Sequence, residues 1–139
     1  MEIIEEAYRF AKKCHSNQKD DCGNPYFDSH ILQVFNILKQ VTDDKDIICA
    51  GLLHDVIEDC DISHKKLSEM FNQNIADLVY EVTHEGKKDN HGFYLPRLKS
   101  RDAILIKFAD RLSNLSRMEY WEDRRKKQYL RKSKFWRSE

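Results

Sequence analysis

The chain has 139 residues and a mass of 16.6 kDa, which is enough for one domain with a single hydrophobic core and too little for two. Hydrophobic residues make up 40% and charged residues 35%, with four Gly and two Pro, which excludes a disordered, collagen-like or low-complexity chain. The 24 basic and 24 acidic residues cancel, so net charge predicts neither a nucleic-acid nor a membrane partner.

The sequence also bears on location and redox state. No apolar run is long enough to cross a bilayer, and the N-terminal segment MEIIEEAYRF is acidic where a signal peptide would be basic. We therefore expect a cytoplasmic protein whose cysteines are reduced thiols. These cysteines are Cys14, Cys22, Cys49 and Cys60.

A turn-rich loop separates the first two predicted helices. Apolar residues recur every three or four positions over residues 3–14 and predict a helix with one apolar face. The segment QKDDCGNPYFDS then collects Gly, Pro, Asn and Asp, which favour turns. Asp28 or Ser29 can cap a second helix, whose apolar residues span 34–41 and whose first turn contains His30.

Three further helices are expected before a polar stretch. A third helix after VTDDKD carries apolar residues over 48–57 and should be the most buried of the chain. Ser63 can cap a short helix that reaches Phe71, and the apolar spacing over residues 75–82 predicts another. The stretch THEGKKDNHGFY then interrupts the helical pattern.

The run AILIKFADRLSNL bears on the fold class. Its first four residues could begin a β-strand, but Ile104, Phe108 and Leu112 step by four, so a long helix fits the whole run better. A last amphipathic helix is expected over about residues 121–135. No pair of alternating strands is visible, so we predict an all-α bundle of six or seven helices, forming a single domain over residues 1–139.

Four ionisable residues lie together in the sequence HDVIED, at the end of the third predicted helix. Residues four positions apart share a helix face, so His54 aligns with Glu58 and Asp55 with Asp59. Buried carboxylates are costly unless a cation or hydrogen bonds compensate, and a divalent metal ion is the simplest partner. The alternative is that Glu58 and Asp59 face water and that His54 is an ordinary buried histidine.

Two further polar residues occupy apolar surroundings. His30 begins an amphipathic helix just after the turn that contains Pro25, and Asp110 lies inside AILIKFADRLSNL. The apolar neighbours of Asp110 predict that it is at least partly buried, next to a metal ion or in a salt bridge. Lys107 and Asn114 lie one turn to either side of it on the same helix face.

The order of these residues resembles the HD-domain metal-dependent phosphohydrolases. The shared pattern is a first histidine, the His-Asp pair within HDVIED, and a last aspartate within KFADRLSN. More narrowly, the sequence resembles the hydrolase domain of the RelA/SpoT alarmone enzymes and the single-domain small alarmone hydrolases. The segments HSNQKDDCGNPYFDSH, AGLLHDVIED, MFNQNIADLVYEVT and ILIKFADRLSNL follow that subgroup in order and cover about residues 5–117.

The resemblance implies a metal-dependent hydrolase. In the family, two histidines and two aspartates hold one divalent ion, typically manganese. The corresponding residues here are His30, His54, Asp55 and Asp110. A Glu-Asp pair, here Glu58 and Asp59, positions and deprotonates the attacking water. The family reaction removes pyrophosphate from the 3′ position of ppGpp or pppGpp and leaves GDP or GTP.

Further polar residues are expected to contact the substrate. By resemblance, Asn114 contacts the sugar or supports Asp110. On grounds of charge, three lysines can neutralise phosphate groups. These are Lys19, Lys87 and Lys88. Two departures from the subgroup fall in the loop expected to hold the base: Asp20 stands where a basic residue is common, and one extra residue separates Tyr26 from His30.

Two alternative functions stay open. One is an HD phosphohydrolase for another nucleotide, such as a nucleoside monophosphate, NADPH or ppApp; the other is a non-catalytic nucleotide-binding HD module. The complete set of ionisable residues favours an enzyme, because a degenerate site is expected to lose at least one of them. Residues 124–137 hold eight basic and no acidic residues, and we interpret them as a solvated helix face rather than a nucleic-acid-binding strip.

Overall fold

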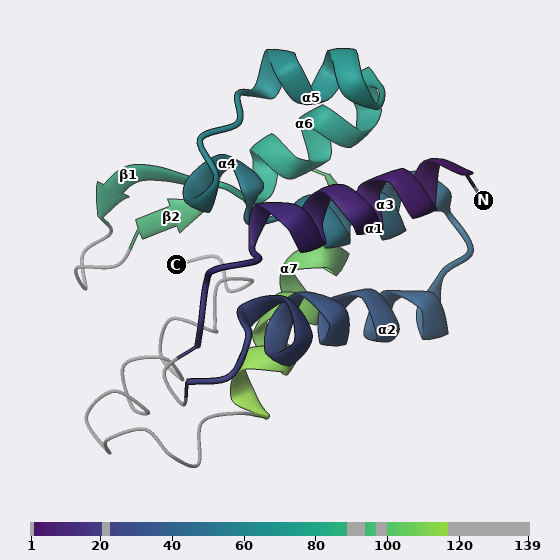
Figure 1. Cartoon of the computed structure of the whole chain (residues 1–139). Coiled ribbons are helices and arrows are strands. Elements are labelled where there is room, and N and C mark those ends of the chain that lie inside the picture. Colours follow the sequence, from purple (N-terminus) through teal and green to yellow (C-terminus); the bar gives the residue numbers. More distant parts are fainter. Residues whose placement is uncertain (1, 21–22, 89–93, 97–99, 117–139) are drawn as a thin grey trace.

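The part of the chain that the structure describes is mostly helical (Figure 1). The structure is a computed structural model, and it describes residues 2–20, 23–88, 94–96 and 100–116. Its elements in chain order are α1 (Glu2–Cys14), the π-helical turn η1 (Phe27–Ile31), α2 (Leu32–Val41), α3 (Lys45–Leu53), α4 (Val56–Asp59), α5 (His64–Met70), α6 (Gln73–Val82), β1 (His84–Lys88), β2 (Tyr94–Pro96) and α7 (Arg101–Leu115). The predicted all-α class is confirmed, with one addition: β1, which lies in the stretch expected to be a polar loop, pairs antiparallel with β2, which begins at the last residue of that stretch.

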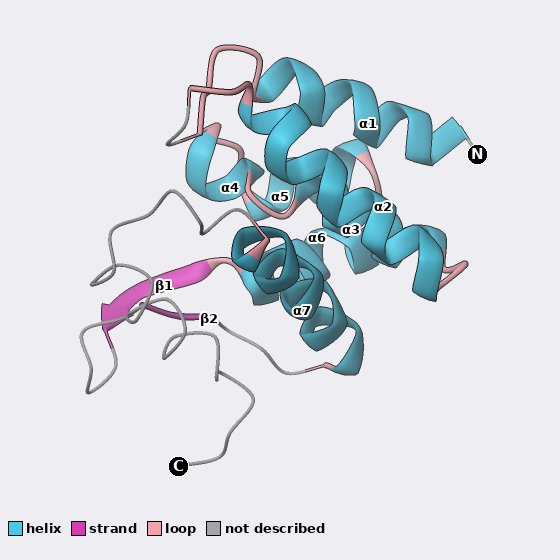
Figure 2. Cartoon of the chain, turned by 90° about the horizontal axis from the view of Figure 1, so that it is seen from below, coloured by secondary structure: helices cyan, strands magenta, loops and turns pink. Residues whose placement is uncertain are grey.

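Helix α3 lies at the centre of the fold. It packs against α1, α2, α6 and α7 (Figure 2), and every residue from Ile47 to Leu53 is buried. Its first turn is fixed by Asp44, whose side chain accepts hydrogen bonds from the backbone N–H groups of Asp46 and Ile47. The prediction that this helix is the most buried one is confirmed, and its last residues lead directly into the HDVIED sequence.

The helix does not continue through HDVIED, so the prediction of one continuous helix is wrong. Helix α3 ends at Leu53, and a turn at His54 and Asp55 separates it from the short α4. Asp55 has φ −104° and ψ 0°, in the bridge region outside the regular α conformation. The turn allows His54 and Asp55, adjacent in sequence, to approach the same point.

Helix α7 confirms the helical interpretation of AILIKFADRLSNL. Ser100 caps it by accepting a hydrogen bond from the N–H of Ala103, and the helix packs against α2, α3 and α6. The predicted helix over residues 121–135 lies outside the described residues. Within the described ranges, none of the helices has the length and apolar character that crossing a bilayer requires.

The start of the second predicted helix differs from the prediction. A π-helical turn, η1, precedes α2, and neither Asp28 nor Ser29 provides a cap; the Ser29 hydroxyl is buried without a hydrogen-bond partner among the described residues. The expected cap is therefore wrong. The π-turn carries His30, which is fully buried, and it packs against α1, α2 and α7.

The expectation of reduced thiols is also wrong for one pair of cysteines. Cys14 and Cys60 form a disulfide, whereas Cys49 is free and buried. Folding brings the end of α1 close to the residue after α4, with the two Cα atoms 5.9 Å apart, inside the range that a disulfide requires. The two cysteines are 46 residues apart in the sequence, so the sequence pattern alone does not show that they are close in the fold.

Candidate metal centre

Two imidazole rings and two carboxylates meet at one buried point between η1, the α3–α4 turn and α7. His30 Nε2 lies 2.9 Å from Asp110 Oδ1 and 3.2 Å from His54 Nε2, and His54 Nε2 lies 3.4 Å from Asp110 Oδ1. Asp55 Oδ2 lies 3.2 Å from His54 Nε2 and 3.8 Å from His30 Nε2. The structure thus brings together all four residues that the sequence predicted as metal ligands.

The four side chains come from different local structures. His30 comes from the π-turn, and His54 directly follows the last residue of α3, in the turn that it forms with Asp55. Asp110 projects from the middle of α7 and is 7% exposed, so the prediction that it is at least partly buried is confirmed. Helix packing, not sequence proximity, joins Asp110 to the other three.

Hydrogen bonds to the other ring nitrogens fix both histidine tautomers. His54 Nδ1 lies 2.7 Å from the Gly51 carbonyl oxygen, so Nδ1 carries the proton and donates it. His30 Nδ1 lies 2.9 Å from Ser113 Oγ, and that hydroxyl donates its own proton to Gln33 Oε1 at 2.7 Å. Ser113 must therefore accept from His30 Nδ1–H. Both rings therefore turn Nε2 toward the cluster, where each Nε2 can hold a proton or, in the neutral ring, bind a metal ion.

The two aspartates have partners of their own. The Tyr26 hydroxyl donates to Asp55 Oδ2 at 2.5 Å. Asp110 is paired with Lys107 Nζ at 3.3 Å and accepts from Asn114 Nδ2 at 3.4 Å. These contacts on α7 agree with the predicted helix face and hold each carboxylate in one orientation.

The surroundings of His54, Asp55 and Asp110 strongly perturb the pKa values of these three side chains. Burial alone would lower the pKa of His54, but the carboxylates of Asp55 and Asp110 raise it well above its usual value. Burial alone would raise the pKa of Asp55, yet the charge and hydrogen bond of His54 hold it well below the usual range. The pKa of Asp110 is likewise held low, mainly by Lys107 against the effect of burial. Positive charge is therefore strongly favoured at this point.

The donor set fits a divalent cation. A cation with octahedral bonds of about 2.1 Å spaces adjacent ligands about 3.0 Å apart. The three closest donor atoms, from His30, His54 and Asp110, are 2.9, 3.2 and 3.4 Å apart. Two imidazoles and two carboxylates suit a borderline metal ion of the first transition row. The chemistry available here is therefore that of a hydrolytic metal centre.

Glu58 and Asp59, the residues predicted to act on water, lie on the short helix that follows Asp55. Both side chains are exposed at the edge of the site. Asp59 Oδ2 accepts a hydrogen bond from Gln18 Nε2 at 3.2 Å. Partial burial of its carboxylate and the negative charge of Asp55 raise the pKa of Asp59 above its usual value.

The predicted substrate residues are only partly placed. Lys19 is exposed in the loop before η1, where its backbone pairs with that of Pro25. The backbones of Lys87 and Lys88 belong to β1, and their side chains lie outside the described structure. Asp20 accepts a hydrogen bond from the backbone N–H of Asn24 at 2.9 Å, so this departure from the subgroup stabilises the turn of its own loop.

Sequence reasoning did not identify four residues that support the site. Tyr26 orients Asp55, Ser113 and Gln33 orient His30, and Gln18 contacts Asp59. Ser113 could have been found, because it lies three residues after Asp110 on a buried helix face. The roles of Gln18, Tyr26 and Gln33 depend on contacts between elements far apart in the sequence.

Known proteins are similar to this chain in sequence and in fold. A guanosine-3′,5′-bis(diphosphate) 3′-pyrophosphohydrolase of Aquifex aeolicus is 36% identical over 135 residues, which cover 91% of this chain and 19% of that protein. A probable enzyme of the same name from Mycoplasma genitalium is 36% identical over 137 residues, covering 86% of this chain and 19% of that protein. The chain thus spans about a fifth of the length of these curated relatives.

A solved structure is similar over nearly the whole chain. It is described as "A metazoan ortholog of SpoT hydrolyzes ppGpp and plays a role in starvation responses". The TM-score is 0.80 at 28% sequence identity, with 97% of this chain and 83% of that chain covered. The sequence profile of the HD domain matches residues 7–91, more than half of the chain. This chain therefore belongs to the HD domain family.

Proposed function

We propose that this chain is a metal-dependent phosphohydrolase that removes the 3′-pyrophosphate of ppGpp and pppGpp. The observation that carries the proposal is the buried meeting of His30, His54 and Asp110, with Asp55 beside them. We further propose that these four residues hold one divalent ion, with manganese as the first candidate. The names of the curated relatives and of the similar solved structure support the choice of substrate.

The proposed reaction breaks the bond between the ribose 3′ oxygen and phosphorus. The bound ion would supply Lewis acidity and lower the pKa of water at the site. Glu58 and Asp59 would accept the proton of the water that attacks phosphorus, while the ribose oxygen leaves and takes up a proton. One water molecule is consumed, and the products are pyrophosphate and GDP or GTP.

The remaining residues would bind and orient the substrate. Tyr26 and Ser113 hold Asp55 and His30 in fixed orientations, which reduces the reorganisation needed when the substrate binds. Asn114, which contacts Asp110, is proposed to reach the ribose. Lys19, Lys87 and Lys88 are proposed to neutralise phosphate charge. The single-domain organisation and the cytoplasmic location stay predictions.

The experiment that tests the function is a product analysis over a panel of nucleotides. The manganese-loaded protein is incubated with ppGpp, ppApp, NADPH and nucleoside monophosphates, and products are separated by ion exchange. We expect pyrophosphate and GDP from ppGpp, with little or no turnover of monophosphates. Rapid cleavage of monophosphates with ppGpp intact would contradict the proposal in favour of a nucleotidase. Binding of ppGpp without any product would favour the non-catalytic module.

A further inference from the structure

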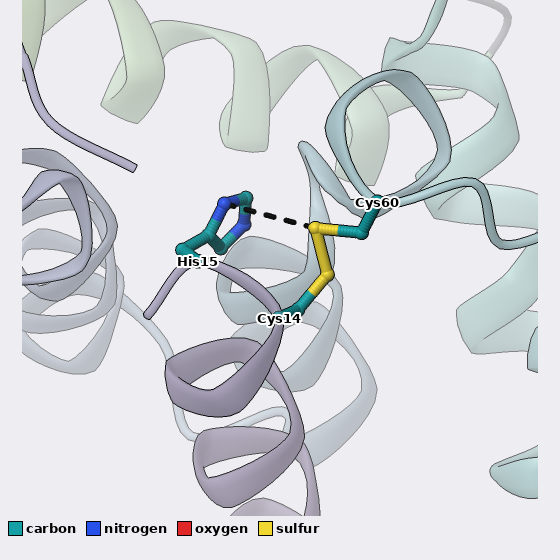
Figure 3. A group of neighbouring side chains, drawn as sticks. All are labelled: Cys14, His15 and Cys60. Carbon is teal, nitrogen blue, oxygen red and sulfur yellow. Dashed lines mark hydrogen bonds between the residues drawn. A yellow bond between two sulfur atoms is a disulfide. The ribbon is translucent and has the colours of Figure 1, made fainter. Parts of the chain in front are cut away.

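A second group of metal-binding side chains lies outside the HD cluster, where α1 ends next to the residue that follows α4. Cys14 is the last residue of α1, His15 comes directly after it, and Cys60 follows α4 (Figure 3). One ring nitrogen of His15 and the two sulfur atoms all lie within 4.8 Å of one another. The group therefore joins two segments that are 46 residues apart in the sequence.

His15 is oriented so that one of its nitrogens keeps a free lone pair. Gln18 Nε2 donates to Asp59, so Gln18 Oε1 is the atom that faces His15 Nδ1, at 2.7 Å. Nδ1 must therefore carry the proton and donate it to Gln18. The other nitrogen, Nε2, is left as an acceptor. This is the arrangement by which second partners usually orient metal-binding histidines.

The free nitrogen is buried and has no partner. The His15 side chain is 1% exposed, and Nε2 has no hydrogen-bond partner among the described residues. A buried polar atom without a partner costs free energy, so native structures usually provide one. This observation does not depend on the cysteines, and the same imidazole ring lies beside them, with Nδ1 3.9 Å from Cys60 Sγ (Figure 3).

The two cysteines supply the remaining donors when they are reduced. In zinc sites the metal–sulfur and metal–nitrogen bonds are about 2.3 and 2.1 Å, so tetrahedral ligand atoms lie about 3.6 to 3.8 Å apart. The three donor atoms are already within 4.8 Å of one another, and the Cα atoms of Cys14 and Cys60 are 5.9 Å apart. Rotation of the cysteine side chains is therefore enough to form such a site. Both cysteines are only partly buried, so reductants and ions can reach them.

We propose that reduced Cys14, Cys60 and His15 form a second metal site, which binds a thiophilic divalent cation of the zinc type separately from the HD cluster. Two molecules of a low-molecular-weight thiol reduce the disulfide, become one disulfide themselves, and transfer two protons to the cysteine sulfurs. Metal binding then releases those protons. The disulfide is the oxidised form of the site and excludes the metal ion.

Cobalt(II) is a direct probe, because thiolate ligands give it an intense near-ultraviolet charge-transfer absorption that the sulfur-free HD cluster cannot produce. Reduced, metal-free full-length protein is titrated with cobalt(II). We expect the band to appear, to saturate at one thiolate-bound ion per chain, and to disappear on addition of zinc(II). The same protein with its disulfide intact should give no band until it is reduced. Absence of the band in the reduced protein overturns the proposal.

Matched variants assign the ligands. Cys14→Ser and Cys60→Ser should each abolish the band, whereas Cys49→Ala, which alters the buried free cysteine, should keep it. Asp110→Ala should also keep it, because Asp110 belongs to the other cluster. His15→Ala should weaken cobalt binding and alter the band. A band that survives in the Cys14→Ser/Cys60→Ser double variant, or that His15→Ala leaves unchanged, overturns the three-residue site.

Discussion

His30 and His54 face each other through their Nε2 atoms at 3.2 Å. Each ring donates from its other nitrogen, His30 to Ser113 and His54 to the Gly51 carbonyl, so the two lone pairs converge. Two lone pairs at this distance repel unless a proton or a metal ion lies between them. The nearby carboxylate of Asp110 makes a cation the favoured occupant.

Asp110→Ala should remove the metal ion from this centre. The substitution deletes the carboxylate that lies closest to His30 and that also contacts His54. Wild-type protein purified without chelator is expected to contain close to one divalent ion per chain, and the variant almost none, by elemental analysis. Asp102→Ala is the matched control, because Asp102 is exposed in the first turn of the same helix. A variant that keeps its metal would remove Asp110 from the ligand set.

Ser113→Ala should weaken metal binding without removing a ligand. The variant leaves His30 Nδ1–H without its acceptor, so the ring loses the hydrogen bond that fixes its orientation. Loss of such a partner typically lowers metal affinity by about 10- to 100-fold. Competition with a chelator measures the change. Ser116→Ala is the control, because Ser116 also contacts Gln33, at 3.4 Å, but does not contact His30. Equal affinities of the two variants would contradict a role for Ser113.

The sequence predicted the helices best where apolar spacing is regular. The sequence predicted that α7 continues past Asp110, because the apolar residues of this segment recur with the period of a helix. It predicted the burial of α3 from the continuous apolar run of that helix. The break at His54 and Asp55 was not predicted. Neither residue is a helix breaker, and the turn depends on tertiary packing around the site.

The sequence predicted the ionisable residues of the candidate site, but it did not predict the residues that hold them in place. The order of His30, His54, Asp55 and Asp110 carried the family resemblance. The hydroxyl and amide partners, such as Tyr26, were not visible because they depend on how η1 packs beside the α3–α4 turn. The disulfide was missed for the same reason, since it joins helix ends that only the fold brings together.

Glu58→Gln should separate catalysis from metal binding. The substitution keeps the shape of the side chain but removes its capacity to accept a proton, and Glu58 does not belong to the group of three closest donors. We expect turnover of ppGpp to fall by about 10²- to 10⁴-fold, the usual contribution of a general base, with unchanged metal content. Glu69→Gln, on the exposed side of α5, is the control. Parallel loss of metal and turnover would instead make Glu58 a metal ligand.

The free energy of unfolding should fall at alkaline pH because the Cys49 thiol ionises more readily in the unfolded chain than in the folded protein. Burial in α3, together with the negative charge of Asp46, raises the pKa of the Cys49 thiol to about 12. In the unfolded chain a thiol ionises near its ordinary pKa of about 8.5. Above that pH the unfolded state releases a proton that the folded state keeps, so stability falls by up to about 1.4 kcal/mol per pH unit until the folded-state pKa is reached.

Comparison with Cys49→Ala isolates this effect from all other groups that titrate at alkaline pH. Urea unfolding of both reduced proteins is measured from about pH 8 to about pH 10, across the interval between the two thiol pKa values. Wild type should be more stable at the lower pH, because alanine leaves a small gap among the buried residues of α3. The difference should shrink, and can change sign, as the pH rises. A difference that stays constant over this interval would mean that the folded protein does not hold Cys49 in the thiol form.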